Sequence, residues 1–420
     1  MARLLFLIPR LSDGGAERVV SNLTLELVKN NQVVICVFST ITGVQYSYGG
    51  HLLDLKAPYS RNPETNNAFQ KMIRLFYLAK VVRRVKRDLR IDTCISFTDN
   101  ANVVNVLSRR FAKVVLSIRS FRSKADKRRN FYGKLFEILT KILFNYADKI
   151  VVPSKEMKID LISNYGIKKD IISCIYNPYN IQWIQNQGQE EIPDTLQSFF
   201  TNPVIINVGR ITHAKGQWHL IRIFNEARKQ IAGLKLVIIG RADGGEQQLV
   251  DYMNSLCEEY GMSYIHFSDS KLIQDYNEFD IIFLGHQPNP FKYISRSTLF
   301  AFPSIYEGFP NALVEALLVG TPAISSDCYS GPREVLAPDT DIFNKTNSLE
   351  IAKYGILVAT PEGNYPPSSS PLSDSELNWL KSILQLLKNN ELRLKFQTNM
   401  TGAFQNLNQG EISTKWEHIF

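Results

Sequence analysis

Two series of short apolar runs, alternating with segments of helical spacing, constrain the fold of this chain most. The first series occupies residues 4–8, 33–38, 93–97, 114–118 and 149–152, with helical spacing between them at 16–29 and 69–89. Short apolar runs rich in β-branched residues are typical of strands that are covered on both faces. Strands that alternate with helices predict an α/β fold with a parallel, doubly wound sheet.

The second series follows a polar, Gln-rich segment at 182–197. Its runs lie at 204–208, 236–239, 264–267, 281–284, 299–302 and 321–325. Single cores rarely grow beyond about 250–300 residues, so a chain of this length fits two domains. We expect domains over 1–176 and 177–395, with a helix over 396–420 that packs back on the first. Doubly wound sheets bind ligands at the carboxyl ends of their strands, which predicts a site in a cleft between the domains.

The stretch from Phe302 to Leu318 carries the strongest chemical signal. A strand is followed by a glycine turn, and Pro310 suits the first position of a helix. The free amides at the start of that helix form an anion site for a phosphate. Glu307 and Glu315 flank the helix start, at most about 12 Å apart at the helical rise. They could be solvated carboxylates, but the apolar neighbours of Glu315 favour a functional role.

Two further segments provide groups of the same kind. Arg210 and Lys215 follow the run at 204–208, and a guanidinium with an ammonium would neutralise a leaving diphosphate. Each could also be an ordinary surface charge. Gly14 and Gly15 follow the first strand, where backbone without a Cβ can approach a phosphate or a sugar. Two adjacent glycines are also common in simple turns.

Together these segments resemble the retaining family 4 glycosyltransferases. Glu307 and Glu315 match the family's Glu-x7-Glu motif, Gly209-Arg210 with Lys215-Gly216 match its Gly-Arg…Lys-Gly segment, and Gly14-Gly15 matches its first loop. The resemblance implies the GT-B fold, with two doubly wound Rossmann-like domains and an interdomain cleft. The first domain would be the acceptor side, and the second would bind a nucleotide sugar. The family generally needs no metal, so no cofactor is expected.

The resemblance also implies residue roles. The expected catalytic residues are Arg210 and Lys215, which bind the donor diphosphate, and Glu307, which contacts the transferring sugar. Glu315 would bind the ribose hydroxyls, and the loop at Gly285 would read the nucleobase. The other expected donor-binding residues are Gly14, Gly15, Arg119, Gly308, Phe309, Pro310, Asn311 and Ala312. Ser330-Gly331-Pro332-Arg333-Glu334 also matches the family, but it fits an ordinary turn and helix start and stays outside the predicted site.

Arg119 marks a departure from the family pattern. Many relatives carry a histidine after a strand of the first domain, often as Ser-x-His, whereas this chain has Ser117-Ile-Arg119. An arginine stays protonated and cannot serve as a base. If Arg119 occupies the histidine position, it would stabilise phosphate or orient the acceptor; a surface arginine is the plain alternative.

Charge divides the chain unevenly. Residues 1–180 hold 30 Lys and Arg against 14 Asp and Glu, whereas 181–420 hold 18 against 26. Cationic and apolar residues mix at helical spacing over 71–87, and further cations follow at Arg109, Arg110, Arg122, Lys124, Lys127, Arg128 and Arg129. Such a surface suits anionic lipid headgroups. A solvated face is the alternative, and nucleic acid is disfavoured because no nucleic-acid module accompanies the cations.

The expected function is transfer of a hexosyl or N-acetylhexosaminyl unit from a nucleotide sugar, UDP-linked, to a lipid-linked or growing polysaccharide acceptor, as in lipopolysaccharide synthesis. Two alternatives stay open: a nucleotide-sugar 2-epimerase of the same architecture, and a non-catalytic protein that binds nucleotide sugar or membrane. Five scattered cysteines indicate a reducing compartment. We therefore expect a cytoplasmic protein, with peripheral attachment to the inner face of the plasma membrane.

Overall fold

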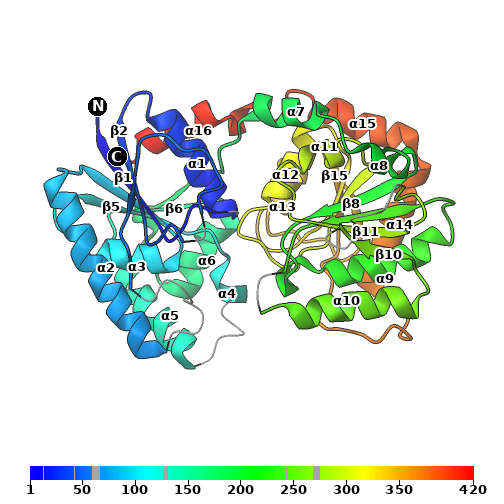
Figure 1. Cartoon of the computed structure of the whole chain (residues 1–420), viewed down its shortest axis with the longest axis horizontal. Coiled ribbons are helices and arrows are strands. Elements are labelled where there is room, and N and C mark those ends of the chain that lie inside the picture. The colour runs from blue at the N-terminus through cyan, green and yellow to red at the C-terminus, as the bar shows by residue number, and fades with distance from the viewer. Residues whose placement is uncertain (13, 42, 59–66, 126–130, 243–244, 268–274) are drawn as a thin grey trace. The chain divides into compact units, whose positions relative to one another are not determined.

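The computed structural model describes residues 1–420 except 13, 42, 59–66, 126–130, 243–244 and 268–274, and without the side chains of 68, 124–125, 131–136 and 139 (Figure 1). It forms two compact units. The N-terminal unit comprises residues 1–180 and 406–420, and the C-terminal unit comprises residues 181–405. Each contains one predominantly parallel sheet with flanking helices, as the α/β prediction requires.

The division lies close to the domain limits expected from sequence but differs at the end of the chain. Helix α15 (Asn390–Met400) packs against α14 (Asp374–Lys388), and its Phe396 and Met400 are buried in the C-terminal unit. The helix expected over 396–420 is therefore two separate pieces. Only residues 406–420, which include α16 (Gln409–Glu417), belong to the N-terminal unit.

The sheet of the N-terminal unit has the strand order β3-β2-β1-β4-β5-β6-β7, and its neighbouring strands are all parallel. The strands are β1 (Arg3–Ile8), β2 (Gln32–Val37), β3 (His51–Asp54), β4 (Thr93–Phe97), β5 (Lys113–Ser117), β6 (Lys149–Val152) and β7 (Ile172–Cys174). The helices, besides α16, are α1 (Gly15–Leu27), α2 (Ala68–Asp88), α3 (Asp99–Leu107), α4 (Arg122–Ala125), α5 (Phe131–Phe144) and α6 (Lys155–Tyr165).

Strand β1 shows why its sequence is almost continuously apolar. Side chains of a strand alternate between its two faces. Leu4, Phe6 and Ile8 join one core cluster with α1, whereas Leu5 and Leu7 join another with α2. Both faces of the strand are thus buried, as the unbroken apolar run predicts.

Helix α2 is not a continuous basic surface. Leu78, Val82 and Lys86 recur every four residues, so they lie on one face of the helix, and all three are buried. The Lys86 ammonium donates to Asn105 Oδ1 at 2.7 Å and to the Ser108 carbonyl at 3.2 Å. Burial lowers the pKa of Lys86. The expectation that residues 71–87 present their cations to a membrane is wrong for Lys86.

The sheet of the C-terminal unit has the strand order β10-β11-β9-β8-β12-β13-β15-β14, with only β14 antiparallel to its neighbour among the described strands. The strands are β8 (Val204–Val208), β9 (Lys235–Ile239), β10 (Tyr264–His266), β11 (Ile281–Gly285), β12 (Leu299–Phe302), β13 (Ala323–Ser326), β14 (Leu349–Ile351) and β15 (Gly355–Val358). The remaining helices are α7 (Ile181–Gln189), α8 (Asp194–Gln197), α9 (Gln217–Arg228), α10 (Gln247–Glu259), α11 (Phe291–Ile294), α12 (Asn311–Leu318) and α13 (Pro332–Leu336).

A buried ionic cluster joins α9 to the start of α14. Glu376 accepts from His219 Nδ1 at 2.8 Å and from Arg222 Nε at 2.9 Å. Burial alone would raise the pKa of Glu376, but these hydrogen bonds and one from the Ser373 amide lower it to about 2. The cluster fixes the helix that follows β8, and therefore the loop between them.

Candidate functional site

The strand order of the C-terminal unit marks where a ligand can enter. From β8, the chain continues to β9 on one side, while β12 lies on the other side. The chain therefore leaves β8 and β12 toward opposite sides, and doubly wound sheets bind ligands at such a switch point. Residues 209–216 form the first loop and residues 303–310 the second. These are the two segments that carry Arg210, Lys215 and Glu307.

An ion pair joins the two loops at the switch point. Lys215, in the 3-10 turn His213–Lys215, places its Nζ 2.6 Å from Glu307 Oε1. The same Nζ lies 5.0 Å from the centre of the Phe302 ring. Glu307 is 8% exposed and the Lys215 side chain 22% exposed. A lysine ammonium has three donor hydrogens, so Lys215 can retain Glu307 and still bind an anion.

Close backbone contact fixes the first loop against the second. The Ile305 amide donates to the Ala214 carbonyl at 2.8 Å. Gly216 has φ +63°, and a Cβ there would lie 2.4 Å from the Pro303 carbonyl oxygen. Only glycine meets both requirements without strain, so Gly216 is needed to seat Lys215 beside Glu307.

Helix α12 presents free amides beside this ion pair. The helix starts at Asn311, and Pro310 is its N-cap with ψ 69°, so the expectation that Pro310 is the first helical residue is wrong by one position. The first regular helical bond runs from the Val314 amide to the Pro310 carbonyl. The amides of Ala312 and Leu313 have no acceptor within the described residues. Amides and helix dipole together suit a phosphate.

Glu315 lies on the same helix, four residues beyond its start, and is buried at 4% exposure among apolar neighbours. Glu315 is therefore not a solvated surface carboxylate. Gly308 and Phe309, the other predicted residues of this segment, belong to the turn between Glu307 and α12.

Sequence reasoning missed the support of this turn. The Glu307 amide donates to the Tyr329 carbonyl at 2.6 Å, and Ser330 Oγ donates to the Gly308 carbonyl at 2.9 Å. Tyr329 and Ser330 lie in the loop between β13 and α13, and a buried ion pair of 2.5 Å between Asp327 and Arg333 joins the two ends of this loop. The segment 330–334 was noted in the sequence and left out of the site, but it supports Glu307.

Gln217 is a second missed residue. Its Nε2 donates to the Arg210 carbonyl at 3.0 Å and to the Gly209 carbonyl at 3.4 Å, and it is fully buried. Gln217 thereby fixes the backbone from which the exposed Arg210 side chain leaves. The sequence offers only its position directly after Lys215-Gly216 as a signal.

Gly285 ends β11 at the same edge of the sheet. Its carbonyl accepts from the Gly240 amide at 2.8 Å. Asn289 organises the following loop, since its Oδ1 accepts from the Phe291 amide and its Nδ2 donates to the Gln187 carbonyl at 3.0 Å. The loop is an ordered turn, and its contact with a nucleobase stays a prediction.

The N-terminal unit has its own topological switch point, between β1 and β4. Gly14 is the N-cap of α1 and Gly15 its first residue, directly after the loop that follows β1. Thr98, at the end of β4, has φ +75° and a buried Oγ1 without a partner within the described residues. Strained backbone of this kind clusters at functional sites.

Arg119 follows β5, and its side chain contacts residues of the N-terminal unit. Its guanidinium hydrogen-bonds to Asn177 Oδ1 and lies 5.2 Å from the Phe97 ring and 6.0 Å from the Trp416 ring. Burial lowers its pKa to about 9, which leaves it charged at neutral pH. Gly14, Gly15 and Arg119 belong to the N-terminal unit and the other predicted residues to the C-terminal unit, so their joint action stays a prediction.

The described residues show neither a metal cluster nor a membrane-spanning helix. Among the described residues, no group of three or more His, Cys, Asp or Glu side chains is placed to hold a metal ion. Within the same residues, no helix has the length and apolar composition needed to cross a bilayer.

Comparison with known proteins places these loops in a family. Residues 13–183 match the model described as Glycosyltransferase Family 4, and residues 188–356 match the one described as Glycosyl transferases group 1. The chain is 30% identical over 350 residues to an uncharacterized glycosyltransferase of Methanocaldococcus jannaschii, with 80% of each chain covered.

Two further similarities cover both units. A Campylobacter jejuni N-acetylgalactosamine-N,N'-diacetylbacillosaminyl-diphospho-undecaprenol 4-alpha-N-acetylgalactosaminyltransferase is 28% identical over 343 residues, which is 81% of this chain and 84% of the relative. The crystal structure of Anabaena HepE in complex with UDP-glucose superposes with a TM-score of 0.71 at 16% identity, with 99% of each chain covered. The chain is thus a glycosyltransferase of family 4, built on the GT-B fold.

Proposed function

We propose that this glycosyltransferase moves a hexosyl or N-acetylhexosaminyl unit from a UDP-sugar, with retention at the anomeric carbon, to a lipid-linked or growing polysaccharide. The observation that carries the proposal is the Lys215–Glu307 ion pair at the β8/β12 switch point, beside the free amides of α12. HepE was crystallised with UDP-glucose, and the Campylobacter relative acts on a diphospho-undecaprenol acceptor by its name. Both support the choice of donor and acceptor.

In the proposed reaction, the α12 amides, Lys215 and Arg210 bind the donor diphosphate. The bond between the anomeric carbon and the diphosphate oxygen breaks, and the negative charge that develops on that oxygen is stabilised by these groups. The acceptor oxygen forms its bond to the anomeric carbon on the same face, and its proton passes to the departing diphosphate. No metal takes part in the proposal.

The two carboxylates have separate proposed roles. Glu307 keeps Lys215 in place through the 2.6 Å contact and reaches the sugar with its other oxygen. Glu315 accepts hydrogen bonds from the ribose diol, for which a buried carboxylate offers strong, orienting acceptors.

A panel of UDP- and GDP-sugars with a lipid-extract acceptor tests the proposal by mass spectrometry, with the anomeric configuration of the product read by NMR. We expect transfer from a UDP-sugar with retention. An inverted product or exclusive use of a GDP-sugar would contradict the proposal. Incubation of the UDP-sugar alone is the control, since an altered sugar without acceptor indicates epimerisation.

We propose further that the N-terminal unit attaches to a membrane surface through α2 and α5. The exposed stripe of α2 begins with Phe69, Met72 and Phe76 and continues three to four residues apart with Lys80, Arg83 and Arg87. The first half of this stripe is apolar and the second half is cationic, which suits insertion of the helix beneath anionic headgroups. Helix α5 adds the exposed Ile138 and Ile142.

Several cations first assigned to this surface do not contribute to it. Arg122 is buried, pairs with Asp99 at 3.0 Å and lies between the rings of Phe144 and Tyr165, so the expectation that it faces lipid is wrong. Lys127, Arg128 and Arg129 lie outside the described residues, and the side chain of Lys124 is not described.

Sedimentation with vesicles that contain phosphatidylglycerol tests the membrane proposal. Phe69→Ser with Phe76→Ser should lower vesicle affinity about a hundredfold or more, since roughly 1.5–3 kcal/mol for each fully buried phenylalanine adds up to about 3–6 kcal/mol. Phe343→Ser, at an equally exposed position of the C-terminal unit, is the matched control. Equal affinity of all variants would remove α2 from the attachment surface.

A further inference from the structure

The Gln-rich segment that separates the two series of strands has no part in the proposed reaction. The structure forms it into helix α7, whose sequence IQWIQNQGQ contains no charged residue. Ile181 and Ile184 bury the apolar face of the helix, and Gln185 and Gln189 are exposed. A polar helix face without charge is unusual in a chain with 21% charged residues.

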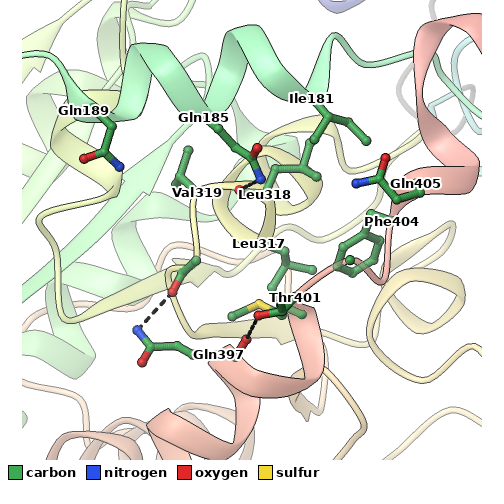
Figure 2. A pocket seen from close by; sticks show the side chains of 13 residues that line it. Ile181, Gln185, Gln189, Leu317, Leu318, Val319, Gln397, Thr401, Phe404 and Gln405 are labelled. Atoms are coloured by element: carbon green, nitrogen blue, oxygen red, sulfur yellow. Dashed lines mark hydrogen bonds between the residues drawn. The ribbon is translucent and has the colours of Figure 1, made fainter.

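Gln185 and Gln189 line one wall of a hollow of about 320 Å³ within the C-terminal unit (Figure 2). The other walls come from the end of α12, from α15 and from residues 401–405. Its floor is apolar, with the buried side chains of Leu317, Met400 and Phe404. A volume of this size falls at the lower end of the range for small-molecule sites, about 300–1,000 Å³.

Hydrogen bonds hold the walls in a fixed arrangement. Gln397 Nε2 donates to the Gly320 carbonyl at 3.1 Å, and Gln185 Nε2 donates to the Leu318 carbonyl at 3.4 Å (Figure 2). Helices α7 and α15 are thus tied to the same end of α12. The side-chain amides of Gln189 and Gln405 also line the hollow and have no partner within the described residues.

The chemistry of the lining selects a class of ligand. None of the thirteen lining residues is Asp, Glu, Lys, Arg or His. A charged ligand would therefore lose hydration without gaining a counter-charge. Amides that both donate and accept, above an aromatic and aliphatic floor, match a pyranose, which has several hydroxyls and apolar C–H faces. We infer that this hollow binds neutral sugar units of a glycan.

The hollow is separate from the proposed donor site. It adjoins Leu317–Gly320 at the carboxyl end of α12, whereas the free amides lie at the amino end of the same helix, about 10 Å away at the helical rise. The inference therefore goes beyond the proposed transfer and does not depend on it.

Isothermal titration of the full chain with neutral gluco-oligosaccharides of one to four units tests the inference, with N-acetylglucosamine oligomers and glucuronate oligomers as comparison ligands. Gln189→Leu with Gln405→Leu removes two unpartnered amides and leaves the walls intact. We expect affinity for the neutral oligosaccharides to fall about tenfold, since each amide hydrogen bond is worth roughly 0.5–1.5 kcal/mol. Glucuronate oligomers should bind more weakly than neutral ones.

Gln182→Leu is the matched control, because Gln182 is exposed on α7 but does not line the hollow. UDP should bind equally to all variants and should not displace the oligosaccharide. Absence of saturable binding, an equal loss in Gln182→Leu, or displacement by UDP would each overturn the inference. Whether or not the hollow binds oligosaccharides, the test of the transfer reaction is unaffected.

Discussion

The carboxyl edges of the two sheets share a topology but differ in how their polar groups are satisfied. In the C-terminal unit, charged groups at or beside the edge are paired, as in Lys215–Glu307 and Arg333–Asp327. In the N-terminal unit, the hydroxyls of Ser12, Thr98 and Ser117 are buried without a partner among the described residues. Buried polar groups are normally paired, so both edges offer groups for a ligand or water to satisfy, since the Ser304 hydroxyl and Gln217 Oε1 of the C-terminal unit also lack a partner among the described residues. The N-terminal edge differs in that its three open hydroxyls lie at or after the ends of three neighbouring strands, β1, β4 and β5.

We propose from this difference a division of work in which the C-terminal unit holds the donor and the N-terminal unit holds the acceptor. An edge with its own ion pairs is preorganised for one fixed ligand, as a nucleotide diphosphate is. An edge with open hydroxyls can adapt to sugars of different shape. The following experiments would break or sharpen this comparison.

Arg333→Met should have the largest effect, because it leaves the Asp327 carboxylate buried without its main partner. Breaking a buried pair in this way costs about 3–5 kcal/mol. The urea midpoint of the C-terminal unit should fall accordingly, and transfer should fall with it because Tyr329 no longer supports Glu307. Lys353→Met, in the exposed pair with Asp339, should leave the midpoint unchanged. A stable Arg333→Met protein would mean that the edge does not rely on its buried pairs.

Lys215→Ala and Glu307→Gln should each lower kcat by about 10²–10³-fold with the fold retained, as for loss of one group that stabilises a developing charge. Wild-type rates in these two variants would reject the proposed site.

Thr98→Val removes an unpartnered hydroxyl at the edge of the N-terminal unit without changing the side-chain shape. It should alter the acceptor KM and leave the donor KM unchanged. A raised donor KM in Thr98→Val would reject the proposed division of work.

Acid should weaken the C-terminal unit before the N-terminal one. The pKa of Glu376 is about 2 in the folded chain, below its ordinary value of 4.5. Its stabilising contribution is therefore complete above about pH 4.5 and is lost as the pH falls toward 2, with an upper size of roughly 3 kcal/mol. In the N-terminal unit, the buried cations Lys86 and Arg119 have neutral hydrogen-bond partners and stay charged in acid. Burial would raise the pKa of Asp54 in the same unit, but hydrogen bonds from Thr40 and Lys56 lower it; Asp54 is only half-buried and should contribute less than Glu376.

Hydrogen exchange between pH 5 and 2.5 can follow each unit separately. Glu376→Gln should remove most of the pH dependence of the C-terminal unit in this range. Equal acid sensitivity of both units would show that the ionic cluster at α9 and α14 does not set the difference.

Arg119→Met should have the smallest effect, about 2 kcal/mol of stability, from the lost contact with Phe97 and Trp416 and the lost bond to Asn177. The donor KM should not change. A raised donor KM at unchanged stability would instead assign Arg119 to the donor site, as the family resemblance implies.

The fold was readable from sequence for most strands that are buried on both faces, although the equally buried β15 was not predicted. The predicted runs 4–8 and 299–302 are apolar without interruption, and those at 93–97 and 204–208 add only the buried Thr93, Ser96 and Asn207. Each run lies within one residue of its strand. Strand β3 was missed because its residues are exposed or half-buried and its four residues include His51 and Asp54. The antiparallel edge strand β14 was also missed, since an edge strand needs few apolar residues.

The site was readable where a motif carries the chemistry and unreadable where tertiary contacts do. Lys215 and Glu307 stand in recognisable segments, and the structure pairs them. Tyr329 acts through its backbone carbonyl, which no side-chain pattern reveals. Lys86 looks like part of a basic surface until its four-residue spacing from Val82 is combined with its burial.

The position of α16 has a consequence for biosynthesis. Ile412 and Trp416 complete the core cluster of the N-terminal unit together with β1 and α1, although all of residues 181–405 are translated in between. Domains usually fold in the order in which they leave the ribosome. Here the core of the first unit can be completed only after residues 181–405 have been translated, so the apolar face that α16 covers stays without its partner until the end of synthesis.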